Sequence, residues 1–385
     1  MRKFLLTITF IGSAFGLGAV VDNEIVIPDI EGYMTLKGDM HLHTVFSDAR
    51  VWPTTRVDEA LWEGLDFIAM TDHVDTRLQR QIKAGYFNED KADRNASYAI
   101  ARKYAGKRLL VIPGGEISRG MPPGHFNVYF ISDADAICRE AEKNDEDHMK
   151  AMESGLDEAL RQGAFTQWNH PNWEKQAPNG VKIWPEHDKI RKDGKMMGIE
   201  IYNQFSGYCP EAHRYALDHD LAMTGGSDAH YPFFQLVDYM HGQHRPVTLI
   251  FAKERTLAGL REALDHRRTA VVAEETVYGD ELSLRPLFAA MVTVSDKKVT
   301  DRKATFTIRN NSTVPIRFKK GTGSEKYYYS PDFVLRPFES KSLTVSPLLV
   351  DNRPGVIEEN VVEVNFIIEN FMVAPDTPLT VKWIL

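Results

Sequence analysis

Short apolar runs alternate with segments of helical spacing from about residue 36 to residue 275. The apolar runs, each short enough to be one buried strand, lie at residues 66–71, 108–114, 126–131, 163–168, 197–202, 221–226 and 246–252. Between them, apolar residues recur every three or four positions, which predicts amphipathic helices over residues 57–65, 95–106, 149–163 and 210–220. Strands that alternate with helices predict βα units and a parallel sheet. Their number and continuity favour a barrel, so the fold class is α/β, with the barrel over residues 30–280.

The pattern changes after about residue 275. The segments 304–321, 341–347, 360–373 and 378–385 are rich in strand-forming residues and are separated by turn residues. A helical pattern is visible only near residues 284–291. We expect residues 285–385 to form a C-terminal β-rich domain of the β-sandwich type. The last histidine is His266, so any histidine-based chemistry belongs to the first part of the chain.

The N-terminus has the pattern of a secretory signal peptide. Arg2 and Lys3 precede an apolar run of about 16 residues, which is followed by small and then polar residues. We expect residues 1–19 to be removed and the protein to be periplasmic or secreted, with no membrane attachment afterwards. An uncleaved anchor is the alternative, although the run is short for a span of about 20 residues.

Composition narrows the choice of partner. The chain of 385 residues has 43% apolar residues and a formal net charge of −8. An acidic protein does not have the clustered Lys and Arg that coat a nucleic-acid backbone. Bound cations can still supply positive charge locally, so a phosphorylated small molecule remains a possible substrate. The sequence does not decide whether Cys138 and Cys209 form a disulfide, and it does not fix the oligomeric state.

Histidines and acidic residues recur where the apolar runs end. In a barrel of parallel strands, the carboxyl ends of the strands face one common mouth, so these side chains are expected to converge. Imidazole and carboxylate ligands suit Zn, Mn and Fe. Alternate residues of a strand point to one side, so the i, i+2 pairs can each offer two ligands to one cation. The residues in this position are His41, His43, His73, Glu116, His125, His170, Asp228 and His230.

Each motif alone has an ordinary structural explanation, and the prediction rests on their repeated placement. Isolated histidines are often hydrogen-bonded structural residues, and "GSDAH" is also ordinary turn chemistry. His213 and His219 lie in a helical pattern with charged neighbours, so we expect them at the surface. His241 and His244 follow a ligand motif and could line the mouth of the site. His187 and His266 also lack the strand-end position.

The ordered motifs "HLHTVFSD", "DFIAMTDH", "PGGEIS", "GHFNVYF", "WNHP", "GIEIYN" and "GGSDAH" resemble those of the polymerase and histidinol phosphatase (PHP) family, over about residues 36–270. The resemblance implies a distorted (β/α)7 barrel that holds two or three divalent metal ions. Carried over by motif, one ion would be held by His41, His43, Glu116 and Asp228. A second would be held by Glu116, His125 and His170, and a third by Asp48, His73 and His230. Ala49 departs from the glycine that commonly follows this aspartate.

The signal pattern and the β-rich tail resemble the exported phosphodiesterase branch of that family (Sb-PDE-like). This implies hydrolysis of a phosphoester, with a diester favoured over a monoester, by a metal-activated hydroxide and without a covalent enzyme intermediate. Asp39 and Asp72 are candidates to orient ligand imidazoles. Asn169, Asn203 and Arg119 are candidates to bind the substrate, although a solvated surface position is the more ordinary one for Arg119.

Two other functions remain open from the sequence. A metal-dependent amidohydrolase that cleaves C–N or C–O bonds would use similar ligands, although no lysine stands where such enzymes usually carry a carbamylated one. An exported metal- or glycan-binding module without enzymatic activity would leave the full ligand set unexplained. The metal, whether Mn, Zn or Fe, is not determined by these ligands.

Overall fold

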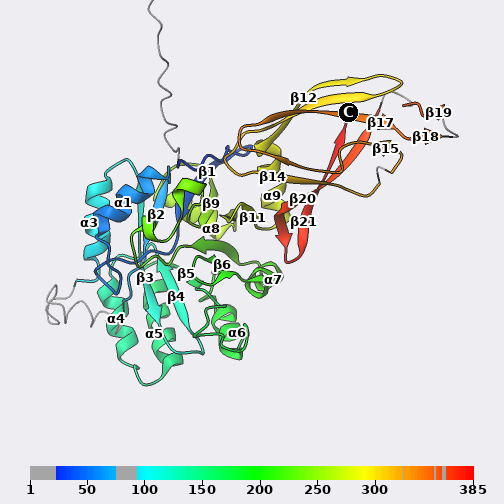
Figure 1. The fold of residues 1–385 in the computed structure, drawn as a ribbon. Helices are drawn as coiled ribbons and strands as arrows, with labels where there is room; N and C mark the ends of the chain where they lie inside the picture. Colours follow the sequence, from blue (N-terminus) through cyan, green and yellow to red (C-terminus); the bar gives the residue numbers. More distant parts are fainter. Residues whose placement is uncertain (1–22, 75–92, 324, 351–352, 358–360) are drawn as a thin grey trace, which may run out of the picture.

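The computed structural model describes residues 23–74, 93–323, 325–350, 353–357 and 361–385 (Figure 1). The expected signal peptide, residues 1–19, lies outside the described residues. In Figure 1 an α/β part, coloured blue to green, adjoins an elongated β-rich part, coloured yellow to red. Within the described ranges, the helices are too short or too polar to span a membrane.

The α/β part is built around a ring of strands, and the site lies at one end of this ring. In ring order these strands are β1 (Met34–Asp39), β2 (Phe67–Met70), β3 (Leu110–Ser118), β4 (His125–Tyr129), β5 (Phe165–Trp168), β6 (Gly198–Asn203) and β8 (Ala222–Gly226). A bridge between Leu42 and Ala229 joins the segment after β1 to the segment after β8. The ring therefore closes, and the expected distorted α/β barrel is confirmed.

The expectation of an all-parallel sheet is wrong at β4. This strand pairs antiparallel with both β3 and β5, whereas β1, β2 and β3 are parallel to one another, as are β5, β6 and β8. Only residues 119–124 separate β3 from β4. A parallel connection needs a crossover of about a dozen residues or more, so β4 must reverse direction.

Helices cover the outside of the barrel, and they begin at residues suited to helix starts. Proline stands at the start of three of them, where its missing N–H costs no hydrogen bond. Asp133 and Asp147 cap α4 and α5 by accepting from the backbone N–H of Ala136 and Lys150. The barrel helices are α1 (Pro53–Trp62), α3 (Ala96–Ala105), α4 (Ala134–Glu142), α5 (His148–Arg161), α6 (Pro185–Lys192), α7 (Pro210–His219) and α8 (Leu257–Asp265).

The β-rich part is a two-layered sandwich, as the sequence predicted. One layer contains β12 (Val292–Val299), β13 (Ala304–Asn310), β17 (Ser340–Pro347) and β15 (Tyr327–Tyr328). The other contains β16 (Asp332–Leu335), β14 (Ile316–Lys320), β20 (Glu363–Ala374) and β21 (Thr377–Ile384). Aromatic rings fill the space between the layers, including those of Phe306, Phe318, Phe366 and Trp383. Short pieces complete the fold: β7 (Gly207–Tyr208), β18 (Leu349–Val350), β19 (Arg353–Pro354) and the 3₁₀ turns Phe233–Gln235 and Tyr239–His241.

The two parts share hydrogen-bonded strands. β1 pairs with β9 (Val247–Ala252), β9 with β10 (Thr269–Ala273), and β10 forms a hairpin with β11 (Thr276–Tyr278). β11 then pairs in parallel with β20 of the sandwich. Helix α9 (Glu281–Met291), where the sequence suggested a helix, leads from the hairpin to β12. Cys138 and Cys209 are both buried and are not joined to each other by a disulfide.

Candidate metal centre

The barrel mouth brings together all nine residues that the family resemblance assigned to metal ions. His41 and His43 follow β1, His73 follows β2, Glu116 lies in β3 and His125 opens β4. Their ligand atoms and those of the other four fall into groups in which every atom lies within 4.8 Å of the others. The groups are His41, His43 and Glu116; His41, His170 and Asp228; Glu116, His125 and His170; and His43, Asp48, His73 and His230.

The first predicted set is the most compact. Nε2 of His41 lies 3.1 Å from Nε2 of His43, and the two nitrogens lie 3.4 Å and 3.0 Å from Oδ1 of Asp228. Glu116 completes the set, with oxygens 3.8 Å and 3.6 Å from the same two nitrogens. In a tetrahedral site with bonds of about 2.1 Å, neighbouring ligand atoms are about 3.4 Å apart. The spacing of these atoms therefore fits one divalent cation.

Glu116 also faces the second predicted set. Its Oε1 lies 3.0 Å from Nδ1 of His125 and 3.4 Å from Nε2 of His170. The Asn169 amide donates to the same oxygen at 3.1 Å. Because the first two imidazoles and the second two approach the same buried carboxylate, Glu116 is in the position of a bridge between two ions.

The third predicted set lies closest to solvent. Oxygens of Asp48 lie 3.0 Å from Nε2 of His230 and 3.4 Å from Nε2 of His73. His43 adjoins this set as well, with its ring stacked on that of His230 at 4.5 Å. The side chains of Asp48, Asp228 and His230 are 15%, 18% and 27% exposed, whereas the other six ligand candidates are at most 5% exposed. The mouth therefore opens on the side of Asp48 and His230.

The donor set suits divalent cations held by nitrogen and oxygen. It contains imidazoles and carboxylates, and no cysteine belongs to the groups found among the described residues. Such sets suit Zn, Mn and Fe, and with open positions they belong to catalytic rather than closed structural sites. The residues present thus fit the metal ions that the fold implies.

The buried carboxylates change the protonation of the imidazoles. Burial by itself lowers the pKa of His73, but the charge of Glu116 and the contact with Asp48 outweigh it and raise this pKa to about 10. Burial likewise opposes protonation of His41, and the charges of Asp228 and Glu200 raise its pKa nevertheless. The imidazolium charges in turn hold the pKa of Glu116 below its usual range, although burial alone would raise it. When no cation is bound, protons on the imidazoles therefore offset the negative charge of the carboxylates in the cluster.

Glu200 is a site residue that the sequence reasoning missed. Its carboxylate accepts from Nδ1 of His41 at 3.2 Å and from the backbone N–H of His170 at 2.8 Å. The first contact leaves Nε2 of His41 for a metal ion. Gly226 lies directly beside both groups, since a Cβ there would lie 2.4 Å from Cβ of His41 and 2.5 Å from Oε1 of Glu200. The usable signal was a lone acidic residue inside the apolar strand "GIEIYN".

Asp39 and Asp72 are buried at the site, but they do not hold imidazoles as expected. Asp72 accepts from the backbone and hydroxyl of Thr44 and from the hydroxyl of Ser47. Asp39 accepts from the backbone N–H groups of His41 and Ser227. Both residues lie beside the chain of the ligand segments, so their side chains reach backbone donors first. They shape the loops that carry the ligands.

Arg56, which the sequence reasoning did not single out, also joins two ligand segments. This fully buried side chain donates to the carbonyls of His43, Ala229 and Tyr231 at 3.1, 2.6 and 3.0 Å. The end of β1 and the loop after β8 are thereby fixed to each other.

The three residues predicted to bind substrate all have partners within the protein, although Nε and Nη2 of Arg119 are buried without a hydrogen-bond partner among the described residues. The amide of Asn169 donates to Glu116, and that of Asn203 donates to Glu200 at 3.2 Å and lies 3.5 Å from Asp228. Arg119 is buried, not at the surface, and pairs with Asp145 in the turn between α4 and α5. Their contact with a substrate stays a prediction.

Two of the other histidines, His187 and His213, are buried within the protein, and the expected surface position of His213 is wrong. His213 is not at the surface, because its Nδ1 bonds the hydroxyl of Tyr208 and its Nε2 bonds the carbonyl of Gly279. His187 is also buried and stacks on Trp168 with 3.8 Å between ring centroids. His241 and His244 line a cleft between the two parts of the molecule.

Comparisons with known proteins find several that this chain is similar to. A family model described as an Ig-like domain matches residues 292–384. No protein of known, curated function matches the chain. PsfC from Pseudomonas syringae is 18% identical, with a TM-score of 0.38 over 66% of this chain and 96% of its own. An amidohydrolase from Chromobacterium violaceum is 16% identical, with a TM-score of 0.35 over 52% of this chain and 89% of its own.

This chain is 39% identical to a two-domain protein from Bacteroides vulgatus whose crystal structure is known. That protein contains a predicted PHP-like metal-dependent phosphoesterase. The match has a TM-score of 0.84 and covers 94% of this chain and 98% of the other. The barrel, the ligand cluster at its mouth and this match over nearly the whole length lead to one conclusion: the chain belongs to the family of two-domain PHP-like metal-dependent phosphoesterases.

Proposed function

We propose that the protein is an exported hydrolase that cleaves organic phosphodiesters with two or three divalent cations held at the barrel mouth. The observation that carries the proposal is the convergence of nine imidazole and carboxylate side chains around the bridging position of Glu116. When bound, such cations neutralise phosphoryl oxygens and lower the pKa of a coordinated water toward 7.

The exposed side chains of the cluster determine the side from which the substrate approaches. Asp48, Asp228 and His230 are the partly exposed members of the cluster, so a phosphate group enters from their side. Behind them, Glu116 and the buried imidazoles exclude solvent from the floor of the site. Glu200 and Asn169 hold His41 and Glu116 in place through hydrogen bonds, so the ligands need little rearrangement on metal binding.

Two parts of the proposal rest on the sequence. The preference for a diester comes from the resemblance to the exported phosphodiesterase branch. Export comes from the signal pattern of residues 1–19. The choice among Mn, Zn and Fe is left to experiment, because availability often decides which of them such a site holds.

The test begins with elemental analysis of protein purified without added metal, followed by assays with Mn or Zn. We expect two or three equivalents of metal and faster hydrolysis of bis(p-nitrophenyl) phosphate than of p-nitrophenyl phosphate. Asp228→Ala is the control for contaminating phosphatases. Faster monoester hydrolysis would replace the diester proposal, and metal-loaded protein inert toward both esters would favour an amidohydrolase or a binding module.

A further inference from the structure

A cleft of about 1,090 Å³ lies between the barrel and the Ig-like domain. On the barrel side it is lined by residues 236–237, 241–247 and 272–275, and on the other side by residues 313–315, 317, 334 and 336–338. Its volume is slightly above the usual range for sites that hold small organic molecules, about 300–1,000 Å³.

The cleft and the metal centre share a wall. Phe205 lines the cleft, and its ring contacts that of His230 edge-on, with 6.4 Å between centroids. Asn203, two residues earlier, accepts from the backbone N–H of Phe205 and places its amide 3.5 Å from Asp228. A substrate group that extends from the metal centre past the exposed side of His230 therefore reaches the cleft beside Phe205.

The cleft lining is mainly apolar, with two buried polar atoms that have no partner. Its walls include Ile25, Leu236, Val247, Val272, Val314 and Phe338. Oε1 of Gln204 and Nδ1 of His244 are buried, and neither has a hydrogen-bond partner among the described residues. Neither atom is exposed to the cleft, so the accessible lining suits an apolar group.

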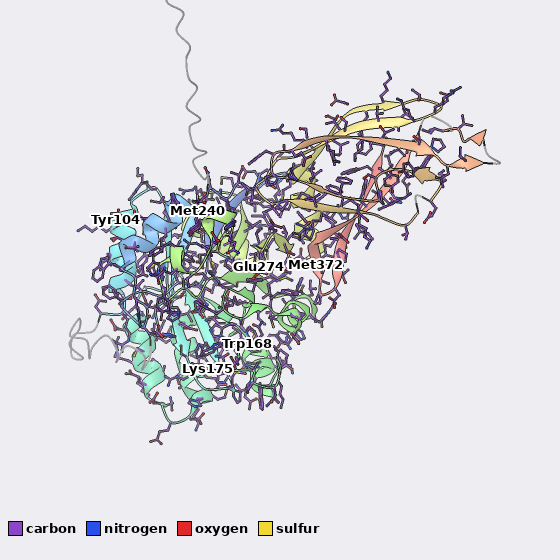
Figure 2. All side chains as sticks on the ribbon, in the orientation of Figure 1. Tyr104, Trp168, Lys175, Met240, Glu274 and Met372 are labelled. Carbon is purple, nitrogen blue, oxygen red and sulfur yellow. The ribbon has the colours of Figure 1, made fainter. Side chains whose placement is uncertain are left out.

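The two walls are held at a fixed separation. The buried amide of Asn370 donates to the carbonyl of Glu275 at 2.6 Å and to that of Pro315 at 2.7 Å, and these residues line opposite walls. Arg317 pairs with the Glu275 carboxylate across the same seam. Glu274 and Glu275 form the β10–β11 turn with φ of 47° and 64°, a conformation that L residues rarely adopt. Met372 of β20, which is labelled with Glu274 in Figure 2, pairs with Tyr278 of β11 at this seam, so the cleft is preformed.

We propose that this cleft is the second half of the substrate site and binds the organic ester group of the phosphodiester. The phosphate lies at the metal centre, and one ester group passes Phe205 into the cleft. That group is a bulky apolar ring or chain. This inference rests on the proposed phosphodiesterase function and names its substrate class.

The test compares two diesters that differ in the group available to the cleft: bis(p-nitrophenyl) phosphate and methyl p-nitrophenyl phosphate. The readout is the ratio of their kcat/KM values on metal-loaded full-length protein. Val334→Trp narrows the cleft from the Ig-like side, and Val361→Trp is the matched control, since the two valines are 48% and 49% exposed and only Val334 lines the cleft. We expect Val334→Trp to lower the ratio about 10-fold and Val361→Trp to leave it unchanged.

A second variant covers the case in which Val334→Trp does not fold. Phe338→Ala removes part of the cleft wall at a half-exposed position and is expected to lower the ratio about 3-fold. Equal ratios in the cleft variants and the control would overturn the inference while leaving the phosphodiesterase function intact. A wild-type protein that hydrolyses neither diester would instead overturn the function, and the inference with it.

Discussion

The carboxylate of Glu200 accepts a hydrogen bond from Nδ1 of His41 at 3.2 Å, while Nε2 of the same ring lies 3.1 Å from Nε2 of His43. One nitrogen of His41 is thus committed to the protein and the other is left for a cation. Partners of this kind orient ligand imidazoles and increase their basicity.

Replacing Glu200 with Gln is expected to weaken metal binding about 10–100-fold without unfolding the barrel. The amide is nearly isosteric but loses the charge that polarises His41. Competition against a chelator measures the affinity. Glu158→Gln, a buried carboxylate on α5 outside the cluster, is the matched control, and equal affinities in the two variants would show that Glu200 has no such role.

Loss of a metal-binding side chain should lower activity far more than it disturbs folding. Asp228→Ala or His41→Ala is expected to lower kcat/KM about 1,000-fold or more, because several kcal/mol of transition-state stabilisation depend on the cations. Steady-state assays and circular dichroism of the same samples check this. A variant that keeps near-wild-type turnover would count against the metal centre.

Arg56 should be important for stability as well as for the site. Arg56→Met leaves three carbonyl groups without their donor and is expected to reduce the free energy of unfolding by about 3 kcal/mol. Urea denaturation of metal-free protein measures it. The exposed Arg102 on α3 gives the control Arg102→Met; similar losses in both variants would refute a special role for Arg56.

Metal binding should release protons. The pKa of His73 is about 10 in the metal-free protein, so this ring is protonated at pH 7, and neighbouring carboxylates raise the pKa values of His41 and His230 as well. An imidazole that binds a metal ion must be neutral, so each cation displaces protons. The affinity for the metal therefore rises as the pH rises from 7 toward the pKa of His73. Calorimetry in buffers of different ionisation enthalpy counts the protons. A binding enthalpy independent of the buffer would contradict the prediction.

Stability away from the site should fall in mild acid because of His187. Burial lowers the pKa of His187 to about 4, and its Nδ1 already accepts from the backbone N–H of Trp184. The unfolded chain, with a pKa near 6.5, binds the proton first as the pH falls. The contribution of neutral His187 to the free energy of unfolding is therefore fully present above pH 6.5 and is lost as the pH falls toward 4. Between pH 7 and pH 5 the loss is about 2 kcal/mol. Denaturation at both pH values should show a smaller difference in His187→Gln than in wild type or in the exposed variant His266→Gln.

The parts of the fold that follow from local patterns could be predicted from the sequence. The strands β2, β5, β6 and β8 and the helices α5 and α7 lie close to their predicted ranges because period and capping are local signals. The reversal of β4 was missed, although the short link after β3 demanded it. The ligand candidates converge because strand ends share one mouth.

What the sequence did not reveal depends on contacts between distant segments. Glu200 meets His41 across 159 positions, and Arg56 meets Ala229 across 173. His213 has charged neighbours in sequence, yet it is buried because Gly279 and Tyr208 satisfy both ring nitrogens. The cleft is formed by two domains and has no motif of its own.

The parallel pairing of β11 with β20 has a consequence for how the molecule can be divided. A barrel cut off before residue 292 would present β11 as an uncovered edge with unpaired N–H and C=O groups. Such an edge is a template for pairing with another molecule. The Ig-like domain covers this edge through β20, so the two halves are best expressed and studied as one piece.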